Sequence, residues 1–162
     1  MAMFKFRLKP IQVCMADDYF SLSHSDGLIA RYVPGLVEDY ALSIDLVYEM
    51  SQYDYDRNFA FMIVNGNTPV GFIMANLDVV ANDLDVCYFI GAEHRGHGYM
   101  RQGLQLFASY LRQINSPFRT LTFEVRRDNL ASQRTLIAVG AKRLGFSEWY
   151  TDELYHLYAL SI

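Results

Sequence analysis

Residues 93 to 100 read Glu93-His94-Arg95-Gly96-His97-Gly98-Tyr99-Met100 and lie between a predicted strand and a predicted helix. An apolar run at 84–90 precedes them, and apolar residues then recur at helical spacing from Met100 to Leu111. Two glycines two positions apart let the backbone turn tightly and direct successive N–H groups to one point. The start of the helix adds unpaired donors and a partial positive charge. The loop therefore predicts a phosphate or pyrophosphate site that needs no metal, with Arg95 adding a charge-assisted contact.

The same loop has a simpler interpretation, as a plain turn that needs glycine for its geometry. Arg101 stands where a GxGxxG fingerprint would have its third glycine, and the Walker pattern GxxxxGK[ST] is absent. These absences argue against the usual dinucleotide and nucleoside triphosphate sites. His94 and His97 flank Arg95, and we expect exposed loop histidines there rather than proton carriers.

A second junction of a strand and a helix follows the first. A strand is predicted at 118–125, and Asn129 begins a shorter helix that ends near Gly140. Strands are predicted at 142–150 and 153–160. Upstream, the sequence predicts a strand at 4–8, a short helix at 15–22, a loop-rich join at 24–34, a helix at 37–50, and strands at 59–64 and 70–77 around an Asn65-Gly66 turn. This order predicts one mixed α/β (α+β) domain over residues 1–162, not a doubly wound Rossmann sheet.

Composition and charge exclude several classes of protein. Of the 162 residues, 52 % are hydrophobic and 20 % charged, which excludes intrinsic disorder. A net charge of −4 gives no basic footprint for nucleic acid and weakly favours a cationic partner such as an amine. Cys14 and Cys87 lack CxxC spacing and the histidines form no HExxH pair, so we expect no metal site. With no bilayer-spanning apolar run and no signal-peptide segment, we expect a cytoplasmic protein without a membrane partner.

Together the two junctions resemble the GNAT superfamily of acyl-CoA-dependent N-acetyltransferases. The RGxGY loop before a long helix, the NxAS motif at 129–132 and the glycine after one short helix carry the resemblance. The RimJ/RimL-like N-terminal protein acetyltransferases are the most similar branch: 85–89 and 93–99 follow their strand-and-loop pattern, and Arg31-Tyr32-Val33-Pro34 resembles their R-Y-M-P. Cys87 and Asp85 depart from that pattern, where the branch prefers glycine and glutamate. The resemblance implies three layers, with a mostly antiparallel, twisted mixed sheet flanked by helices and splayed at its centre.

The resemblance also implies acetyl-CoA as cosubstrate, bound between the strands at 84–90 and 118–125. Backbone groups of Phe89 and Ile90 are then expected to pair with the pantetheine arm, and one N–H to hold the oxyanion. The acceptor amine attacks directly, without a covalent enzyme intermediate. The pyrophosphate is expected at the amides of the loop and the helix start, which are those of Arg95, Gly96, His97, Gly98, Tyr99 and Met100.

Three side chains are candidates for proton transfer. Glu124 is the first candidate for the base that deprotonates the amine, although a solvent-facing glutamate explains it equally well, and Asp85 is the second. Ser132 could protonate the departing CoA thiolate or only satisfy donors of its helix. Asn129 could reach the cofactor or only cap that helix. Many GNAT enzymes carry a tyrosine in the last helix as general acid, but Leu136 stands at that position here.

Three functions are compatible with the sequence. The first is acetylation of a protein or peptide α-amine. The second is acetylation of a small amine, such as a polyamine, amino acid or aminoglycoside, for which the Asp17–Asp18 and Asp54–Asp56 pairs hint at an acidic cleft. The third is a non-catalytic acyl-CoA sensor. We expect an amine acceptor, no nucleic acid, and a monomer or homodimer.

Overall fold

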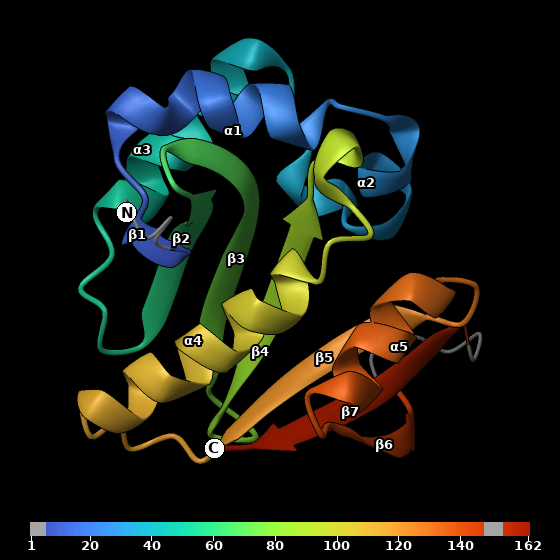
Figure 1. Cartoon of the computed structure of the whole chain (residues 1–162). Helices are drawn as coiled ribbons and strands as arrows, with labels where there is room; N and C mark the ends of the chain where they lie inside the picture. Colours follow the sequence, from blue (N-terminus) through green and yellow to red (C-terminus); the bar gives the residue numbers. More distant parts are fainter. Residues whose placement is uncertain (1–5, 148–153) are drawn as a thin grey trace, which may run out of the picture.

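The structure is a computed structural model that describes residues 6–147 and 154–162. Within them the chain forms one seven-stranded sheet in the order β1-β2-β3-β4-β5-β7-β6, and only the β4–β5 pair is parallel (Figure 1). This agrees with the predicted mixed, mostly antiparallel sheet. The strands are β1 (Arg7–Pro10), β2 (Asn58–Asn65), β3 (Thr68–Asp78), β4 (Asp83–Ile90), β5 (Thr120–Arg126), β6 (Lys142–Phe146) and β7 (Tyr155–Ser161).

Helices cover both faces of the sheet, which gives the three layers expected. One face carries α1 (Ala16–Ser23), α2 (Gly27–Tyr32) and α3 (Tyr40–Ser51), and the other carries α4 (Tyr99–Gln113) and α5 (Leu130–Ala138). Successive side chains of a strand point to opposite faces of the sheet, so one strand contributes to both cores. In β2, Phe61 and Ile63 pack under α4, whereas Ala60 and Met62 pack under α1 and α3. Short 3-10 turns at Val13–Met15, Pro34–Leu36 and Ala92–His94 complete the described elements.

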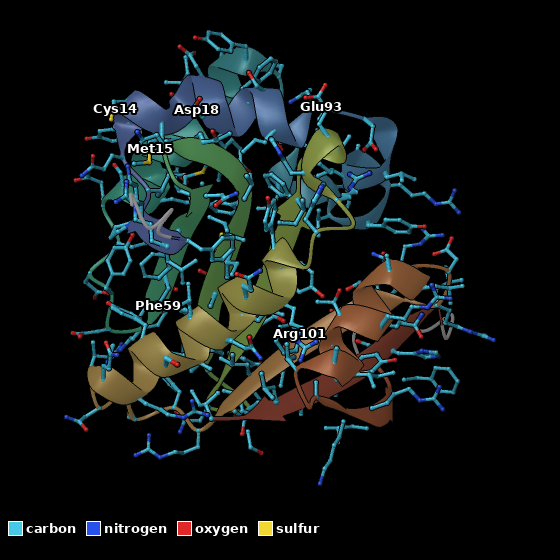
Figure 2. The ribbon with its side chains drawn as sticks, in the orientation of Figure 1. Cys14, Met15, Asp18, Phe59, Glu93 and Arg101 are labelled. Carbon is cyan, nitrogen blue, oxygen red and sulfur yellow. The ribbon has the colours of Figure 1, made fainter. Side chains whose placement is uncertain are left out.

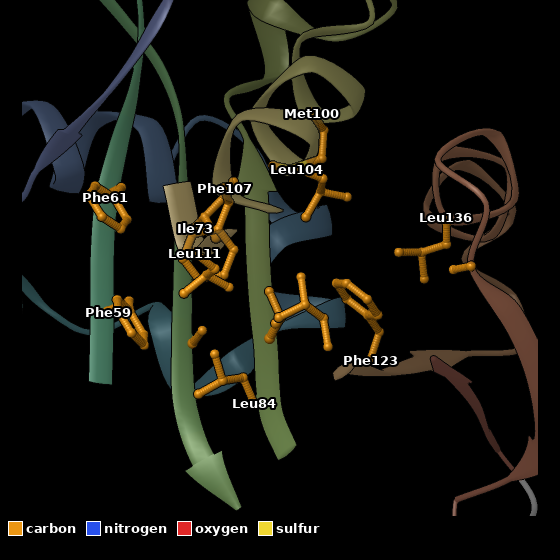
Figure 3. Packing of buried hydrophobic residues seen from close by; sticks show 14 of the residues in the cluster. Phe59, Phe61, Ile73, Leu84, Met100, Leu104, Phe107, Leu111, Phe123 and Leu136 are labelled. Atoms are coloured by element: carbon orange, nitrogen blue, oxygen red, sulfur yellow. The ribbon is translucent and has the colours of Figure 1, made fainter. Parts of the chain in front are cut away.

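The larger core lies under α4 and α5. Leu104, Phe107 and Leu111 recur on one face of α4 and are at most 1 % exposed, as the helical spacing of the sequence predicts (Figure 3). From β5 and α5, Phe123 and Leu136 face the same cluster. Burying one such side chain fully stabilises the fold by about 1.5–3 kcal/mol. This core therefore fixes α4 and α5 on opposite sides of the β4–β5 junction.

The centre of the sheet is splayed, as the resemblance implies. β4 and β5 pair only at Leu84–Leu121 and Asp85–Thr122. Beyond these pairs the two strands diverge, and Figure 1 shows the gap widening toward the end of β4. Past Asp85, the edge of β4 that faces β5 therefore has no strand partner. This opens backbone groups of 86–90 toward the space between the two strands.

The prediction of a loop at 24–34 is wrong, because α2 forms inside it. Asp26 caps this helix: its side chain accepts a hydrogen bond from the N–H of Leu28 at 3.0 Å. Two other boundaries differ: α3 begins at Tyr40, after its cap Asp39, and β5 begins at Thr120. The strand predicted at 4–8 is seen as β1, and those at 142–150 and 153–160 as β6 and β7; their parts at 4–5, 148–150 and 153 lie outside the described residues.

Gly71 of β3 is packed against the end of β4 and offers the first test. A methyl group there would lie 2.5 Å from the carbonyl oxygen of Phe89 and 2.5 Å from Cδ1 of Ile90. We expect Gly71→Ala to lower the free energy of unfolding by about 2–3 kcal/mol, because a backbone atom must move. Urea unfolding measures this. Gly35→Ala, with no atom within 4 Å of the added carbon, is the control and stays within about 0.5 kcal/mol of the wild type.

Candidate active site

A cleft of about 450 Å³ opens between β4 and α5. All the cofactor-binding residues predicted from the sequence line it, except His97, whose side chain is exposed and stacks on Tyr99. The part of the cleft lining that α2 contributes was not predicted from the sequence. The lining consists of Leu28, Ile29, Tyr32, Val33, Tyr88, Phe89, Ile90, His94, Arg95, Gly96, Gly98, Tyr99, Met100, Arg101, Asn129, Ala131, Ser132, Arg134 and Thr135.

The glycine loop at one end of the cleft has the geometry of an anion cradle. Gly96 and Gly98 have φ values of +78° and +74°, which side chains with a Cβ rarely adopt. No described residue accepts a hydrogen bond from the N–H groups of 96, 97 or 98, and α4 starts immediately after them. These donors and the helix dipole fit a pyrophosphate without a metal.

Arg95 has another partner than the one predicted. Its guanidinium forms an ion pair with Asp26 and donates from Nε to the carbonyl oxygen of Ile90 at 3.2 Å. The hydrogen bond from Arg95 holds the pKa of Asp26 below its usual range. Arg95 thus ties the loop to the start of α2. Two further arginines line the cleft and are exposed: Arg101, at the start of α4 (Figure 2), and Arg134 of α5, neither of which forms an ion pair with a described residue.

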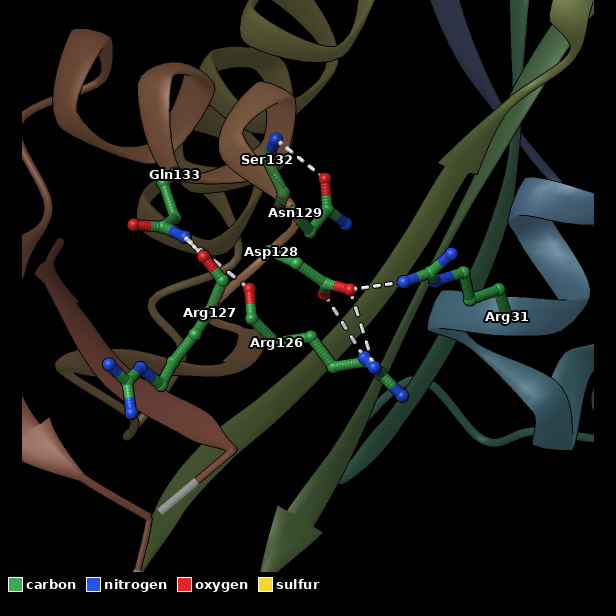
Figure 4. Close-up of polar contacts among 7 residues, drawn as sticks. All are labelled: Arg31, Arg126, Arg127, Asp128, Asn129, Ser132 and Gln133. Atoms are coloured by element: carbon green, nitrogen blue, oxygen red, sulfur yellow. Dashed lines mark hydrogen bonds and ion pairs between the residues drawn. The ribbon is translucent and has the colours of Figure 1, made fainter.

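The helix α2 bridges the two sides of the cleft. At its start Asp26 contacts Arg95, and near its end Arg31 forms an ion pair with Asp128 at the β5–α5 turn, 2.5 Å from Nη2 to Oδ2 (Figure 4). Asp128 also accepts from Nε of Arg126 at 3.1 Å, and this contact lowers the pKa of Asp128. The sequence signal for this helix was the aspartate directly before Gly27-Leu28-Ile29, a pattern typical of a helix start.

The helix α5 presents Ser132 to the cleft. Asn129 caps the helix, its Oδ1 accepting from the N–H of Ser132 at 3.1 Å, so the capping role expected for Asn129 is confirmed (Figure 4). The hydroxyl of Ser132 lies 2.6 Å from that of Tyr88 on β4. Burial raises the pKa of Tyr88, so this phenol keeps its proton. Leu136 is fully buried in the core and offers the cleft no acid.

The two candidate bases lie on the face of the sheet opposite to α4 and α5. They are next to the point where β4 and β5 part, which we call the apex of the splay. Asp85 is paired in register with Thr122, and Glu124 follows two residues later on the same face of β5. Burial, and next the negative charge of Glu124, raise the pKa of Asp85 to about 6. Glu124 accepts a hydrogen bond from the hydroxyl of Ser147. Cys87 lies beyond Asp85 on this face, and burial raises the pKa of its thiol to about 12, so it stays protonated.

The described residues, 6–147 and 154–162, lack the features of two other classes of protein. No three histidine, cysteine or acidic side chains gather there as a metal site would require. None of the helices in those residues has the length and apolarity needed to cross a membrane.

Several solved structures share this fold. The chain superposes on a RimL ribosomal L7/L12 α-N-protein acetyltransferase in complex with coenzyme A at a TM-score of 0.84 and 16 % identity, covering 100 % of this chain and 97 % of that one. The microcin C7 self-immunity acetyltransferase MccE with acetyl-CoA and AMP gives 0.80 at 14 % identity, covering 98 % and 93 %. An acetyltransferase from Thermus thermophilus gives 0.78 at 21 % identity, covering 100 % of both chains. At these identities the likeness establishes the fold alone.

The family comes from the sequence match. No curated protein sequence matches the chain. The model of the family described as "Acetyltransferase (GNAT) domain" matches residues 5–142, which is most of the chain. That range includes the splayed strands, the glycine loop and α5. The chain therefore belongs to the GNAT family of acetyltransferases.

Proposed function

We propose that this GNAT domain transfers the acetyl group of acetyl-CoA to the N-terminal α-amine of a protein or peptide. One observation carries the proposal: an anion cradle follows the end of β4 on one face of the sheet, and a carboxylate pair lies on the other face, where β4 and β5 part. The Arg31-Tyr32-Val33-Pro34 motif and the RimL-like strand-and-loop pattern support a protein α-amine as acceptor. The fold shared with RimL, named as an α-N-protein acetyltransferase, is in accord with it.

The residues of the cleft fit the cosubstrate. The N–H groups of residues 96–98 and the start of α4 would hold the pyrophosphate. Arg101 and Arg134, which also line the cleft, would bind a further phosphate of the cosubstrate. Phe89 and Ile90 lie on the part of β4 whose edge toward β5 lacks a strand partner, so backbone groups on that edge would pair with the pantetheine arm. Acetyl-CoA supplies an activated thioester, and an N–H of this strand would stabilise the negative charge that develops on its carbonyl oxygen.

The carboxylate pair would remove the proton from the attacking amine. An α-amine has a pKa of about 8, so most of it is protonated at neutral pH and a base is needed. A base is most effective when its pKa lies near the working pH, and the pKa of Asp85, about 6, meets this condition. We therefore assign the proton acceptor to Asp85, with Glu124 raising its pKa. Both carboxylates also favour a cationic acceptor on this face.

This assignment predicts a pH effect for Glu124→Gln. Removing the neighbouring negative charge lowers the pKa of Asp85 from about 6. The acid limb of the kcat/KM profile, where activity is lost as Asp85 becomes protonated, then moves to lower pH. The kcat/KM profile should be measured from about pH 4.5 to 8.5. We expect the acid limb of the variant at lower pH than that of the wild type, with activity retained at neutral pH. Loss of activity at every pH would instead make Glu124 the base.

The acceptor class is tested by a panel of amines at saturating acetyl-CoA. We expect the highest kcat/KM with a peptide that has a free α-amine, and little transfer to the same peptide when it is N-formylated and offers only a lysine. Mass spectrometry locates the acetyl group. Faster transfer to a polyamine or aminoglycoside would replace the proposed acceptor with a small amine. Binding of acetyl-CoA without transfer to any amine would make the protein a sensor.

A further inference from the structure

The cleft contains one close contact between hydroxyl groups of described residues, and it crosses from β4 to α5. Oη of Tyr88 and Oγ of Ser132 are 2.6 Å apart, and both residues line the cleft. The ring of Tyr88 packs edge-on against Phe123 of the core, with ring centroids 6.1 Å apart. The backbone N–H of Ser132 is bound by the cap residue Asn129. Both partners of the contact are thus held by the structure around them.

The acidity of the two hydroxyl groups sets the direction of this hydrogen bond. Ser132 Oγ is the one described atom within hydrogen-bond distance of the Tyr88 hydroxyl, so whichever group donates leaves the hydrogen of the other without an acceptor among the described residues. A phenol is the stronger acid, hence the better donor, and an aliphatic hydroxyl is the better acceptor. Tyr88 therefore donates to Ser132, and the hydrogen of Ser132 is left to point into the cleft.

The other hydroxyl of α5 in the cleft is already engaged. Thr135 donates to the carbonyl oxygen of Ala131 at 3.0 Å, and Leu136 is fully buried among core residues. Among the described residues of α5 that line the cleft, Ser132 is thus the one whose hydroxyl hydrogen has no acceptor. A free donor in an apolar cleft is suited to an atom that gains negative charge during the reaction.

We infer that Tyr88 is a positioning residue, whose hydroxyl donates to Ser132 Oγ and turns the serine O–H toward the sulfur of the cosubstrate. The inference rests on the proposed function and extends it to the leaving group. As the amine nitrogen bonds to the carbonyl carbon, the C–S bond breaks and its electron pair goes to sulfur. Ser132 stabilises the resulting thiolate by a hydrogen bond, while the proton of the amine goes to Asp85. Tyr88 keeps its own proton throughout.

Binding of CoA compared with desulfo-CoA tests this without turnover. Desulfo-CoA lacks the sulfur and is otherwise the same ligand. Because a hydrogen bond to a charged group makes a larger contribution than one between neutral groups, we expect wild type to bind CoA about tenfold more tightly than desulfo-CoA at about pH 9. The preference should shrink at about pH 6.5, where a thiol is neutral. Isothermal titration calorimetry gives the affinities, and absorbance at the thiolate band gives the pKa of the bound thiol.

Three variants separate the roles. Ser132→Ala should abolish the preference for CoA and raise the pKa of the bound thiol. Tyr88→Phe keeps the ring and should reduce the preference to about threefold, with desulfo-CoA affinity unchanged as evidence of a folded cleft. Tyr110→Phe, a half-buried tyrosine of α4 outside the cleft lining, should match the wild type.

The outcomes distinguish this inference from the proposed function. If wild type binds CoA and desulfo-CoA equally, Ser132 does not contact the sulfur and the inference is overturned, while the proposed function stands. If Tyr88→Phe keeps the full preference and Ser132→Ala loses it, the positioning role of Tyr88 is overturned. If wild type binds neither ligand, the proposed function fails and the inference fails with it.

Discussion

Asp85→Asn is expected to lower kcat/KM for acetyl transfer by about 10²–10⁴-fold at neutral pH, the usual contribution of a positioned general base. The amide keeps the size of the side chain and its place at the apex of the splay, opposite Thr122. It cannot accept the proton of the amine. The affinity for CoA should be unchanged, because Asp85 lies on the other face of the sheet from the residues that line the cleft.

The same substitution should stabilise the fold. The pKa of Asp85 is about 6 in the folded protein and near 3.8 in the unfolded chain, so the folded state binds the proton more tightly. Its stabilising contribution is therefore present below about pH 3.8 and is lost as the pH rises through about 6. At neutral pH the buried charge is a penalty, and Asp85→Asn should raise the free energy of unfolding by about 1–3 kcal/mol. An active site that costs stability is a common trade-off.

Asp83→Asn is the matched control for both effects. Asp83 lies two residues earlier on β4 and points to the same face, but it is paired with Asp78 rather than placed at the apex. We expect its kcat/KM to stay within about threefold of the wild type and its stability within about 0.5 kcal/mol. Steady-state kinetics and urea unfolding measure the two quantities. If Asp85→Asn retained full activity, Asp85 would not be the base.

Gly98→Val is expected to weaken CoA binding by at least about 100-fold, because it distorts the anion cradle. Gly98 has a φ of +74° at the start of α4, and a β-branched residue cannot hold this conformation without strain of about 1–2 kcal/mol or more. The backbone would rotate, and the N–H groups of 96–98 would no longer converge. Gly98→Asn is the matched control, since asparagine tolerates a positive φ and should keep most of the affinity.

Calorimetry measures the CoA affinity of the Gly98 variants, and thermal unfolding shows whether each variant is folded. The expected result is a large loss of affinity in Gly98→Val and a small one in Gly98→Asn, with both proteins folded. Because no atom lies within 4 Å of a carbon added at Gly98, a steric clash inside the protein does not explain such a loss. Equal CoA affinity in all three proteins would contradict the anion cradle.

Local patterns were sufficient to predict most of the fold. The Asn65-Gly66 turn, the apolar spacing of α4 and the glycine loop each report on structure a few residues away, and the structure has them where predicted. The helix α2 was not predicted from the sequence because it has six residues and lies among glycine and proline residues. Its capping residue Asp26 is nevertheless recognisable in the sequence.

The candidate site depends more on contacts between distant residues. Arg95 was assigned to a phosphate, but its partner Asp26 lies 69 residues away, and no spacing rule links the two. Tyr88 and Ser132 are likewise 44 residues apart. Our proposal that Asp85 rather than Glu124 is the base could not come from the sequence, because the burial that raises the pKa of Asp85 exists only once β4 is inside the sheet.

We propose that this chain acetylates an α-amine by using both faces of the splayed sheet. CoA release by the wild-type protein from acetyl-CoA and a peptide whose α-amine is its one free amine, at about pH 7.5, near the pKa of such an amine, tests this proposal. We expect release that saturates in both substrates and stops when the α-amine is formylated. Tight binding of acetyl-CoA with no release above the rate of spontaneous hydrolysis, for this peptide or any other amine, would contradict it.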